Sequence, residues 1–203
     1  LSFLSTIPNM TVVSPKNRWE LADMLRFAFD FGHPVAVRYP RGAAYEGMKK
    51  FRSPIEYGKG EVLYEEEDIA VIFVGHMAEL ADCVRRGIKD TGYSCSLVNA
   101  RFVKPLDTAL LEELAKDHRL FLTIEENVLI GGFGEQVMDY VSRAGLDVHV
   151  RNIGISDEYV EHGNVEVLRK EVGLDKEAIV KQAVADYLAI LGKSSAADKE
   201  IRG

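Results

Sequence analysis

The chain has 203 residues, of which 47% are hydrophobic and 28% charged, and this is the composition of an ordinary folded protein rather than a disordered one. Its formal net charge of −7 excludes a general surface for nucleic acid or for an anionic membrane, because both partners demand a dense excess of Lys and Arg. Any phosphate that the protein binds must therefore be met by a local site.

The first predicted unit is a strand, a helix and a second strand. Residues 10–13 are apolar or β-branched and predict a short strand. Asn17, with Glu20 three places on, has the pattern of a capping box, and apolar residues then recur at helical spacing to about Phe31. A Gly-His-Pro sequence ends this helix, and residues 35–39 predict a buried strand. A crossover helix of this kind joins parallel strands, so the unit predicts part of a parallel sheet.

A loop and a second block of elements follow. Residues 40–60 are rich in Gly and charge without a sustained period, and they predict a loop that connects two domains. Residues 61–64 and 69–74 predict strands, and the second is apolar throughout, as in sheets covered on both faces. Further helices are predicted at 77–89, from 105 onward and up to 143, with strands at 94–98, 120–124 and 148–153. Two C-terminal helices complete the block, the last capped by Asp175 and running to Leu191.

This alternation predicts an α/β fold with a doubly wound, mostly parallel sheet over residues 61–192. Residues 1–45 hold only two strands and one helix, which cannot bury both faces of a sheet, so we expect them to be the end of a domain whose beginning is absent. Residues 46–60 are the expected linker. Residues 193–203 lack a core pattern and are expected to be a mobile tail.

Cysteine use and hydropathy indicate the compartment. Cys83 and Cys95 lack the C-x-x-C spacing, and a disulfide framework would need more cysteines. No segment approaches the about 20 consecutive apolar residues of a membrane span, and the N-terminus has no basic region of a signal peptide. We therefore expect a cytoplasmic protein that contacts no membrane. Because Leu1 is not an initiator Met, we also expect the chain to begin inside a longer protein.

The sequence Val-Arg-Tyr-Pro-Arg-Gly at residues 37–42 is the most informative for chemistry. It sets Arg38 and Arg41 at the C-terminal end of a predicted parallel strand, where open α/β sheets gather their ligands. The planar guanidinium suits phosphate because it offers paired donors. In the alternative interpretation, Arg38 pairs with a carboxylate and Arg41 is solvated in the loop, and spacing alone favours that structural reading.

Several short motifs follow one another along the chain in a particular order and spacing. They are Ile7-Pro8-Asn9-Met10, Ser14-Pro15, residues 36–42, Gly58-Lys59-Gly60, residues 101–107, Glu125-Glu126-Asn127, residues 131–134 and residues 152–157. The Glu-Glu-Asn sequence with its glycine cluster is widespread among transketolase-like enzymes. The whole series, however, resembles the 1-deoxy-D-xylulose-5-phosphate synthase family of these thiamine-diphosphate-dependent enzymes. The resemblance covers nearly all of the chain except the tail, and it matches only the C-terminal portion of the family.

The resemblance implies an enzyme with a diphosphate-binding, a pyrimidine-binding and a C-terminal domain, of which residues 1–45 are the end of the second. Family members act as homodimers with thiamine diphosphate and Mg²⁺. They condense pyruvate with glyceraldehyde 3-phosphate, with decarboxylation, for isoprenoid, thiamine and pyridoxal precursors. The arginine that matches Arg38 helps to bind the triose phosphate, and Arg41 is expected to be a second contact or a scaffold for the loop. The cofactor, metal and catalytic residues belong to parts preceding Leu1, so we expect no catalytic or cofactor-binding residue, no bound cofactor and no activity in this chain alone.

The remaining polar candidates are expected to be structural. Glu125 and Glu126 should hydrogen-bond the glycine turn at residues 131–134 and the N-terminus of the helix that follows. That turn lacks the full G-x-G-x-x-G pattern and is expected to be structural rather than a phosphate cradle. The five histidines are scattered without metal-ligand spacing. Only His162 deserves watching, with packing or a domain contact as its expected role.

Two other readings stay open at this stage. The first is the β-type subunit of a 2-oxoacid dehydrogenase, which shares the same pair of domains. Such a subunit has no need for a triose-phosphate anchor, so residues 38–42 favour the synthase. A non-catalytic α/β module that binds a partner or mediates dimerisation is the second. It predicts a stable dimer without affinity for the cofactor.

Overall fold

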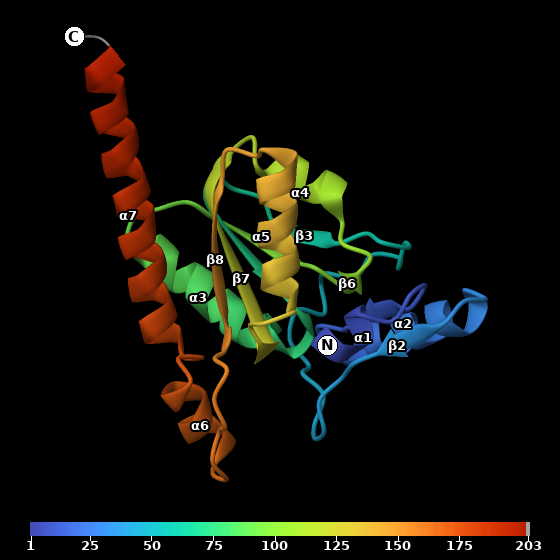
Figure 1. Ribbon diagram of the computed structural model, residues 1–203. Helices are drawn as coiled ribbons and strands as arrows, with labels where there is room; N and C mark the ends of the chain where they lie inside the picture. Colours follow the sequence, from blue (N-terminus) through green and yellow to red (C-terminus); the bar gives the residue numbers. More distant parts are fainter. Residues whose placement is uncertain (202–203) are drawn as a thin grey trace.

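The centre of the protein is a five-stranded sheet with the strand order β3-β5-β4-β7-β8 (Figure 1). The computed structural model describes the backbone of residues 1–201 and the side chains of residues 1–192, so the predicted mobile tail, 193–203, lies outside the fully described part. The strands are β3 (Glu61–Tyr64), β4 (Asp68–Phe73), β5 (Cys95–Asn99), β7 (His118–Val128) and β8 (His149–Ile155). All neighbouring pairs are parallel except β3 with β5. The predicted doubly wound, mostly parallel sheet is confirmed.

Helices cover both faces of this sheet. α3 (Ala78–Asp90), preceded by a 3-10 turn at Gly75–Met77, packs with α7 (Lys176–Ile201) on one face, and α4 (Thr108–Leu114) with α5 (Phe133–Ala144) on the other (Figure 1). Side chains alternate along β4, so that Ile69, Val71 and Phe73 enter the first core and Ala70 and Ile72 the second. The uninterrupted apolar run in β4 therefore reflects a strand that is buried on both faces.

Side-chain caps mark three helix starts, and two of these caps, Asn17 and Asp175, were predicted from the sequence. Asn17 accepts a hydrogen bond from the N–H of Glu20, Asp107 from that of Leu110 and Asp175 from that of Ala178. The last helix continues to Ile201 instead of ending near Leu191. None of the helices, within the residues searched, is long and apolar enough to cross a membrane.

The first block forms a second, three-stranded sheet with the order β2-β1-β6. The first block consists of α1 (Ser2–Ser5), β1 (Thr11–Val13), α2 (Arg18–Asp30) and β2 (Val35–Val37). β1 and β2 are parallel, as predicted, although β2 is shorter than expected. Sequence analysis missed β6 (Phe102–Lys104), which pairs antiparallel with β1. This strand links the block to the main domain, and its three residues are too few for a recognisable alternation.

A buried cluster of charges also joins the two parts. Lys16 and Glu20 come from the first block, whereas Glu61 and Arg101 come from the main domain, and all four side chains are at most 9% exposed. Lys16 Nζ lies 2.7 Å from Glu20 Oε1 and 2.6 Å from Glu61 Oε2. Arg101 reaches Glu20 at 2.8 Å and Glu61 at 3.1 Å, and Asn99 donates to Glu20. Two cations therefore neutralise two carboxylates in the interior.

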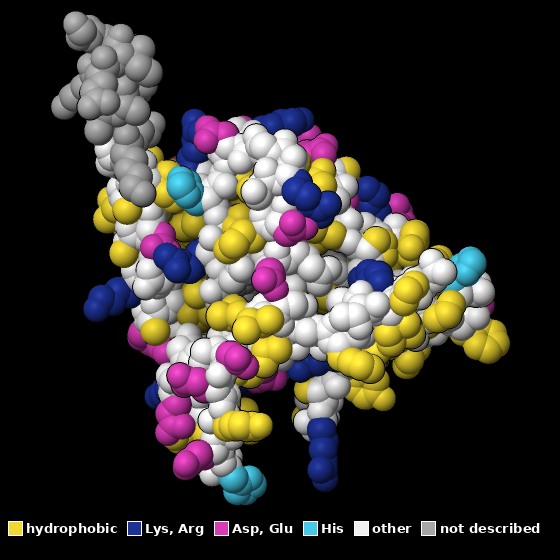
Figure 2. All heavy atoms as spheres, viewed as in Figure 1, with side chains coloured by type: hydrophobic (Ala, Val, Ile, Leu, Met, Phe, Trp, Pro, Cys, Tyr) yellow, Lys and Arg dark blue, Asp and Glu magenta, His cyan; other side chains and the backbone are white. Residues whose placement is uncertain are grey.

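The first block leaves large apolar side chains uncovered. Phe29 is 89% exposed, and Phe3 and Leu25 are also exposed. Hydrophobic side chains lie on the surface in the region where Figure 1 places α1, α2 and β2 (Figure 2). Exposed aromatic rings cost free energy in water and are typical of surfaces that another part of a protein covers. The predicted domain boundaries, which separate residues 1–45, 46–60 and 61–192, stay predictions.

Candidate functional site

Arg38 lies at the carboxyl end of β2, and its backbone is held by β1. Its N–H donates to the carbonyl of Val13 at 2.8 Å, and its carbonyl accepts from Ser14 Oγ at 2.9 Å. From this fixed point the side chain extends to the main domain, where it meets residues that follow β4 and belong to the end of β7. The predicted strand-end position of Arg38 is thus a junction between the two sheets.

The guanidinium of Arg38 contacts His76 and Glu126. Nη1 lies 2.6 Å from His76 Nδ1, and Nη2 donates to the backbone carbonyl of Glu126 at 3.2 Å. On its other side, His76 Nε2 bonds to Glu126 Oε2. Because arginine can only donate, His76 Nδ1 must accept, and the ring proton must then be on Nε2, which donates to the carboxylate.

A second arginine holds the other oxygen of Glu126. Arg169, on α6 (Val165–Glu171), donates from Nε to Glu126 Oε1 at 3.0 Å. The hydrogen bond with His76 is the largest of the effects that lower the pKa of Glu126 to about 2, and Arg169 adds to it while burial opposes it. Burial lowers the pKa of Arg38, and the charge of Glu126 opposes that shift. The site contains two guanidiniums, one carboxylate and one imidazole.

Arg41 lies on a groove beside this network. The groove has a volume of about 260 Å³, and its lining includes Lys16, Tyr39, Arg41 and His76. Arg41 is exposed there, and His76 connects the groove to Arg38. The structure therefore brings Arg41 and the partner of Arg38 to one opening.

The two adjacent glutamates have different roles. Glu125 accepts from the N–H groups of Phe133 at 2.9 Å and Gly134 at 2.8 Å, so it occupies the N-terminus of α5 as predicted. Burial raises the pKa of Glu125, and these backbone hydrogen bonds oppose the shift. A Cβ at Gly132 would come within 2.7 Å of Glu125, which explains the glycine there. For Glu126 the prediction of a contact with the glycine turn is wrong, because its carboxylate points to His76 and Arg169.

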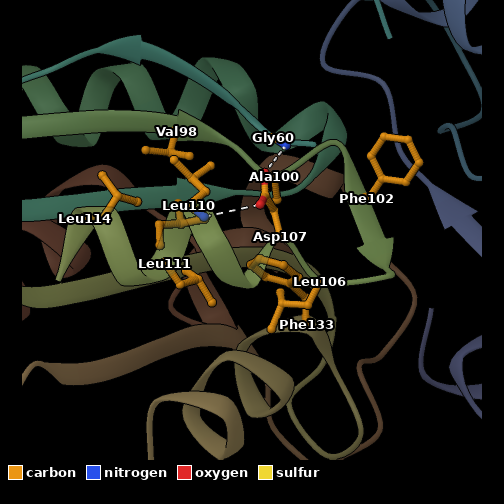
Figure 3. Close-up of a pocket in the computed structure, with 11 residues that line it drawn as sticks. Gly60, Val98, Ala100, Phe102, Leu106, Asp107, Leu110, Leu111, Leu114 and Phe133 are labelled. Carbon is orange, nitrogen blue, oxygen red and sulfur yellow. Dashed lines mark hydrogen bonds between the residues drawn. The ribbon is translucent and has the colours of Figure 1, made fainter. Parts of the chain in front are cut away.

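A cavity on another part of the described structure has a different character. The cavity in Figure 3 lies between α4 and the sheet, has about 20 Å³ and is apolar apart from Asp107, which accepts from Gly60 and Leu110. That volume holds about one water molecule. His162 is exposed in the segment between β8 and α6. Over the residues searched, no group of three His, Cys, Asp or Glu could hold a metal ion.

Sequence analysis missed His76, Glu126 and Arg169 as partners of the strand-end arginine. A signal for two of them was present. His76 follows β4 and Glu126 lies near the end of β7, and these two strands are parallel neighbours. The carboxyl ends of parallel strands meet at one edge of a sheet, so the two residues could have been expected together. Arg169 has no such signal because it lies on a separate helix.

We expect the stabilising effect of Glu126 to disappear in acid. A carboxyl group whose pKa is lower in the folded than in the unfolded protein stabilises the fold above its ordinary value, near 4.5, and loses this effect as the pH falls to about 2. Urea unfolding of the wild type and Glu126→Gln between pH 7 and 2 would measure it. The difference in unfolding free energy should be constant above about pH 5 and shrink below it. A difference that persists unchanged at pH 2 would contradict the ion-pair network.

Comparisons with known proteins agree with this fold. A family model described as transketolase, C-terminal domain, matches residues 58–179. The chain is 45% identical over 181 residues to the 1-deoxy-D-xylulose-5-phosphate synthase of Lachnoclostridium phytofermentans, and 43% identical over 192 residues to that of Aquifex aeolicus. These alignments cover 89% and 93% of this chain but only 29% and 30% of the two synthases. The chain matches the C-terminal portion of these relatives.

Two solved structures have the same architecture. One is described as "Split gene transketolase, inactive beta4 tetramer", with a TM-score of 0.84, 27% identity and coverage of 94% of this chain and 61% of that chain. The other is a transketolase from Campylobacter jejuni, with a TM-score of 0.68, 16% identity and coverage of 91% and 27%. At 16% identity, the second likeness concerns the fold alone.

Proposed function

Because the chain belongs to the transketolase C-terminal domain family, we propose that it forms the C-terminal part of a 1-deoxy-D-xylulose-5-phosphate synthase. The complete enzyme, meaning this chain together with the part of the synthase relatives that it does not cover, condenses pyruvate with glyceraldehyde 3-phosphate. Carbon dioxide leaves, and the product is 1-deoxy-D-xylulose 5-phosphate, a precursor for isoprenoid, thiamine and pyridoxal synthesis. The proposed enzyme is a cytoplasmic homodimer. Identities of 37–45% to curated synthases support this assignment.

The observation that carries the proposal is the placement of Arg38 at the carboxyl end of β2, beside the groove that Arg41 and His76 line. The Arg38 side chain is 28% exposed. A guanidinium has five N–H donors, and the contacts to His76 and the Glu126 carbonyl use two of them. The others are the donors that we propose for phosphate oxygens. A phosphate held here would keep the aldehyde in a fixed position relative to the attacking carbon.

Thiamine diphosphate and Mg²⁺ belong to the complete enzyme in this proposal. The described residues do not fit a Mg²⁺-diphosphate site, since no group of three His, Cys, Asp or Glu side chains that could hold a metal ion occurs among those searched. The acidic Glu125 is committed to the N-terminus of α5, and Glu126 to His76 and Arg169. No step of the reaction is therefore assigned to the cofactor within this chain, whose residues bind and orient the phosphorylated substrate.

The two alternatives are less well supported. A β-type subunit of a 2-oxoacid dehydrogenase would not need Arg38 and Arg41 at the strand end, and the curated relatives described above are synthases. The second alternative, a non-catalytic module, would apply only to this chain in isolation. The solved split-gene transketolase is an inactive β4 tetramer, and by analogy we expect this chain alone to be inactive.

An assay of the 203-residue chain and of the complete enzyme would test the proposal. Each would receive pyruvate, glyceraldehyde 3-phosphate, thiamine diphosphate and Mg²⁺, and the purified chain would be verified by its mass of 22.6 kDa. We expect deoxyxylulose phosphate from the complete enzyme only. Turnover by the chain alone would refute the assignment of the catalytic parts elsewhere. A folded complete enzyme without turnover would favour the non-catalytic module.

A further inference from the structure

We propose that His76 and Glu126 are positioning residues that hold the Arg38 guanidinium ready for the phosphate of the aldehyde substrate. The inference rests on the proposed function, and it assigns a role to two residues that touch the arginine instead of the substrate. Its basis is the chain of contacts from Arg38 through His76 to Glu126 and on to Arg169.

The Arg38 side chain would sample many rotamers if nothing held it. A long side chain loses rotamer entropy when it is fixed, and a ligand that had to fix it would bind more weakly. In this structure Nη1 is already held by His76 and Nη2 by the Glu126 carbonyl. The guanidinium is thus oriented before a phosphate arrives.

Glu126 also determines the direction of the hydrogen bond between His76 and Arg38. An imidazole that could change its tautomer would present either a lone pair or a proton to Arg38, and a proton would repel it. The Glu126 carboxylate bonds to Nε2 and keeps the ring proton there. His76 Nδ1 is thereby left as an acceptor for Arg38.

The Glu126 carboxylate does not hydrogen-bond to the Arg38 guanidinium. Glu126 Oε2 lies 3.9 Å from Arg38 Nη2, beyond hydrogen-bonding distance, while Oε1 is held by Arg169 at 3.0 Å. A direct bidentate pair would occupy the donors that the phosphate needs. With two guanidiniums and one carboxylate, the group keeps a net positive charge for the anion.

Steady-state kinetics of the complete enzyme would test this inference. His76→Ala and Glu126→Ala should each raise the KM for glyceraldehyde 3-phosphate about 10-fold, because the anchor is misplaced but still present, and change the KM for pyruvate less than about twofold. Inhibition by inorganic phosphate should weaken in parallel. His76→Asn should stay within about threefold of the wild type, because Asn Oδ1 is as many bonds from Cα as His Nδ1 and can accept from Arg38.

Two controls make the outcome decisive. Glu113→Ala removes an exposed glutamate that pairs with Lys116 on the surface, and it should change neither KM. If Arg38→Ala leaves the KM for the aldehyde unchanged, the proposed function fails. If Arg38→Ala raises it but neither alanine variant does, only the positioning role fails.

A purely structural role would have a different signature. It predicts equal losses for both substrates, a lower melting temperature and no recovery in His76→Asn. Should Glu126→Ala fail to fold, the comparison of His76→Ala with His76→Asn still decides: similar KM values in these two variants would overturn the inference.

Discussion

Replacing Arg38 by alanine should lower kcat/KM for glyceraldehyde 3-phosphate about 100-fold in the complete enzyme, with little change in the KM for pyruvate. Hydrogen bonds between charged partners contribute about 1.5–3 kcal/mol each, and the loss of one or two to the phosphate corresponds to this factor. The effect should be specific because pyruvate carries no phosphate. Initial rates measured with each substrate varied in turn would determine both parameters.

Arg26 provides a matched control for this experiment. It is an exposed arginine on α2 that pairs with Asp23 at the surface, and Arg26→Ala should leave both substrates unaffected. Arg41→Ala should have a smaller effect than Arg38→Ala, since Arg41 lies on an exposed loop at the groove. An equal loss for pyruvate and the aldehyde in Arg38→Ala would reject the role of Arg38 as a phosphate anchor.

Replacing Arg101 by methionine should reduce the free energy of unfolding by about 3–5 kcal/mol, which is a large part of the stability of an ordinary domain. Methionine keeps most of the apolar stem but removes the charge between Glu20 and Glu61. These carboxylates would then share the single cation of Lys16 inside the protein. Urea unfolding followed by circular dichroism would measure the loss.

A surface ion pair gives the reference for that measurement. Arg119 bonds to Asp147 where both side chains are exposed, so Arg119→Met should cost less than about 1 kcal/mol. If Arg101→Met were as mild as Arg119→Met, the buried cluster would not be what ties the first block to the main domain.

Local signals in the sequence were enough to predict most of the main domain. These signals are the apolar run in β4, the caps at Asn17 and Asp175 and the alternation of strands with helices, and each depends on residues a few positions apart. The same is true of Glu125, which caps a helix that begins eight residues later. Such patterns express periodic burial and local hydrogen bonding, and both are determined by the order of the residues.

The tertiary structure alone decided how these pieces meet. β6 pairs with β1, Glu20 meets Arg101 across 81 residues of sequence, and Arg38 meets His76 and Glu126 across 38 and 88 residues. Periodicity tells which side of an element is buried but not which partner it is buried against. The sequence by itself thus determined the α/β fold and placed Arg38 at the end of a strand. The partners of Arg38 were decided only by how the two sheets pack, because Arg38 follows β2 of the three-stranded sheet, whereas His76 and Glu126 lie near the carboxyl ends of β4 and β7 in the five-stranded sheet.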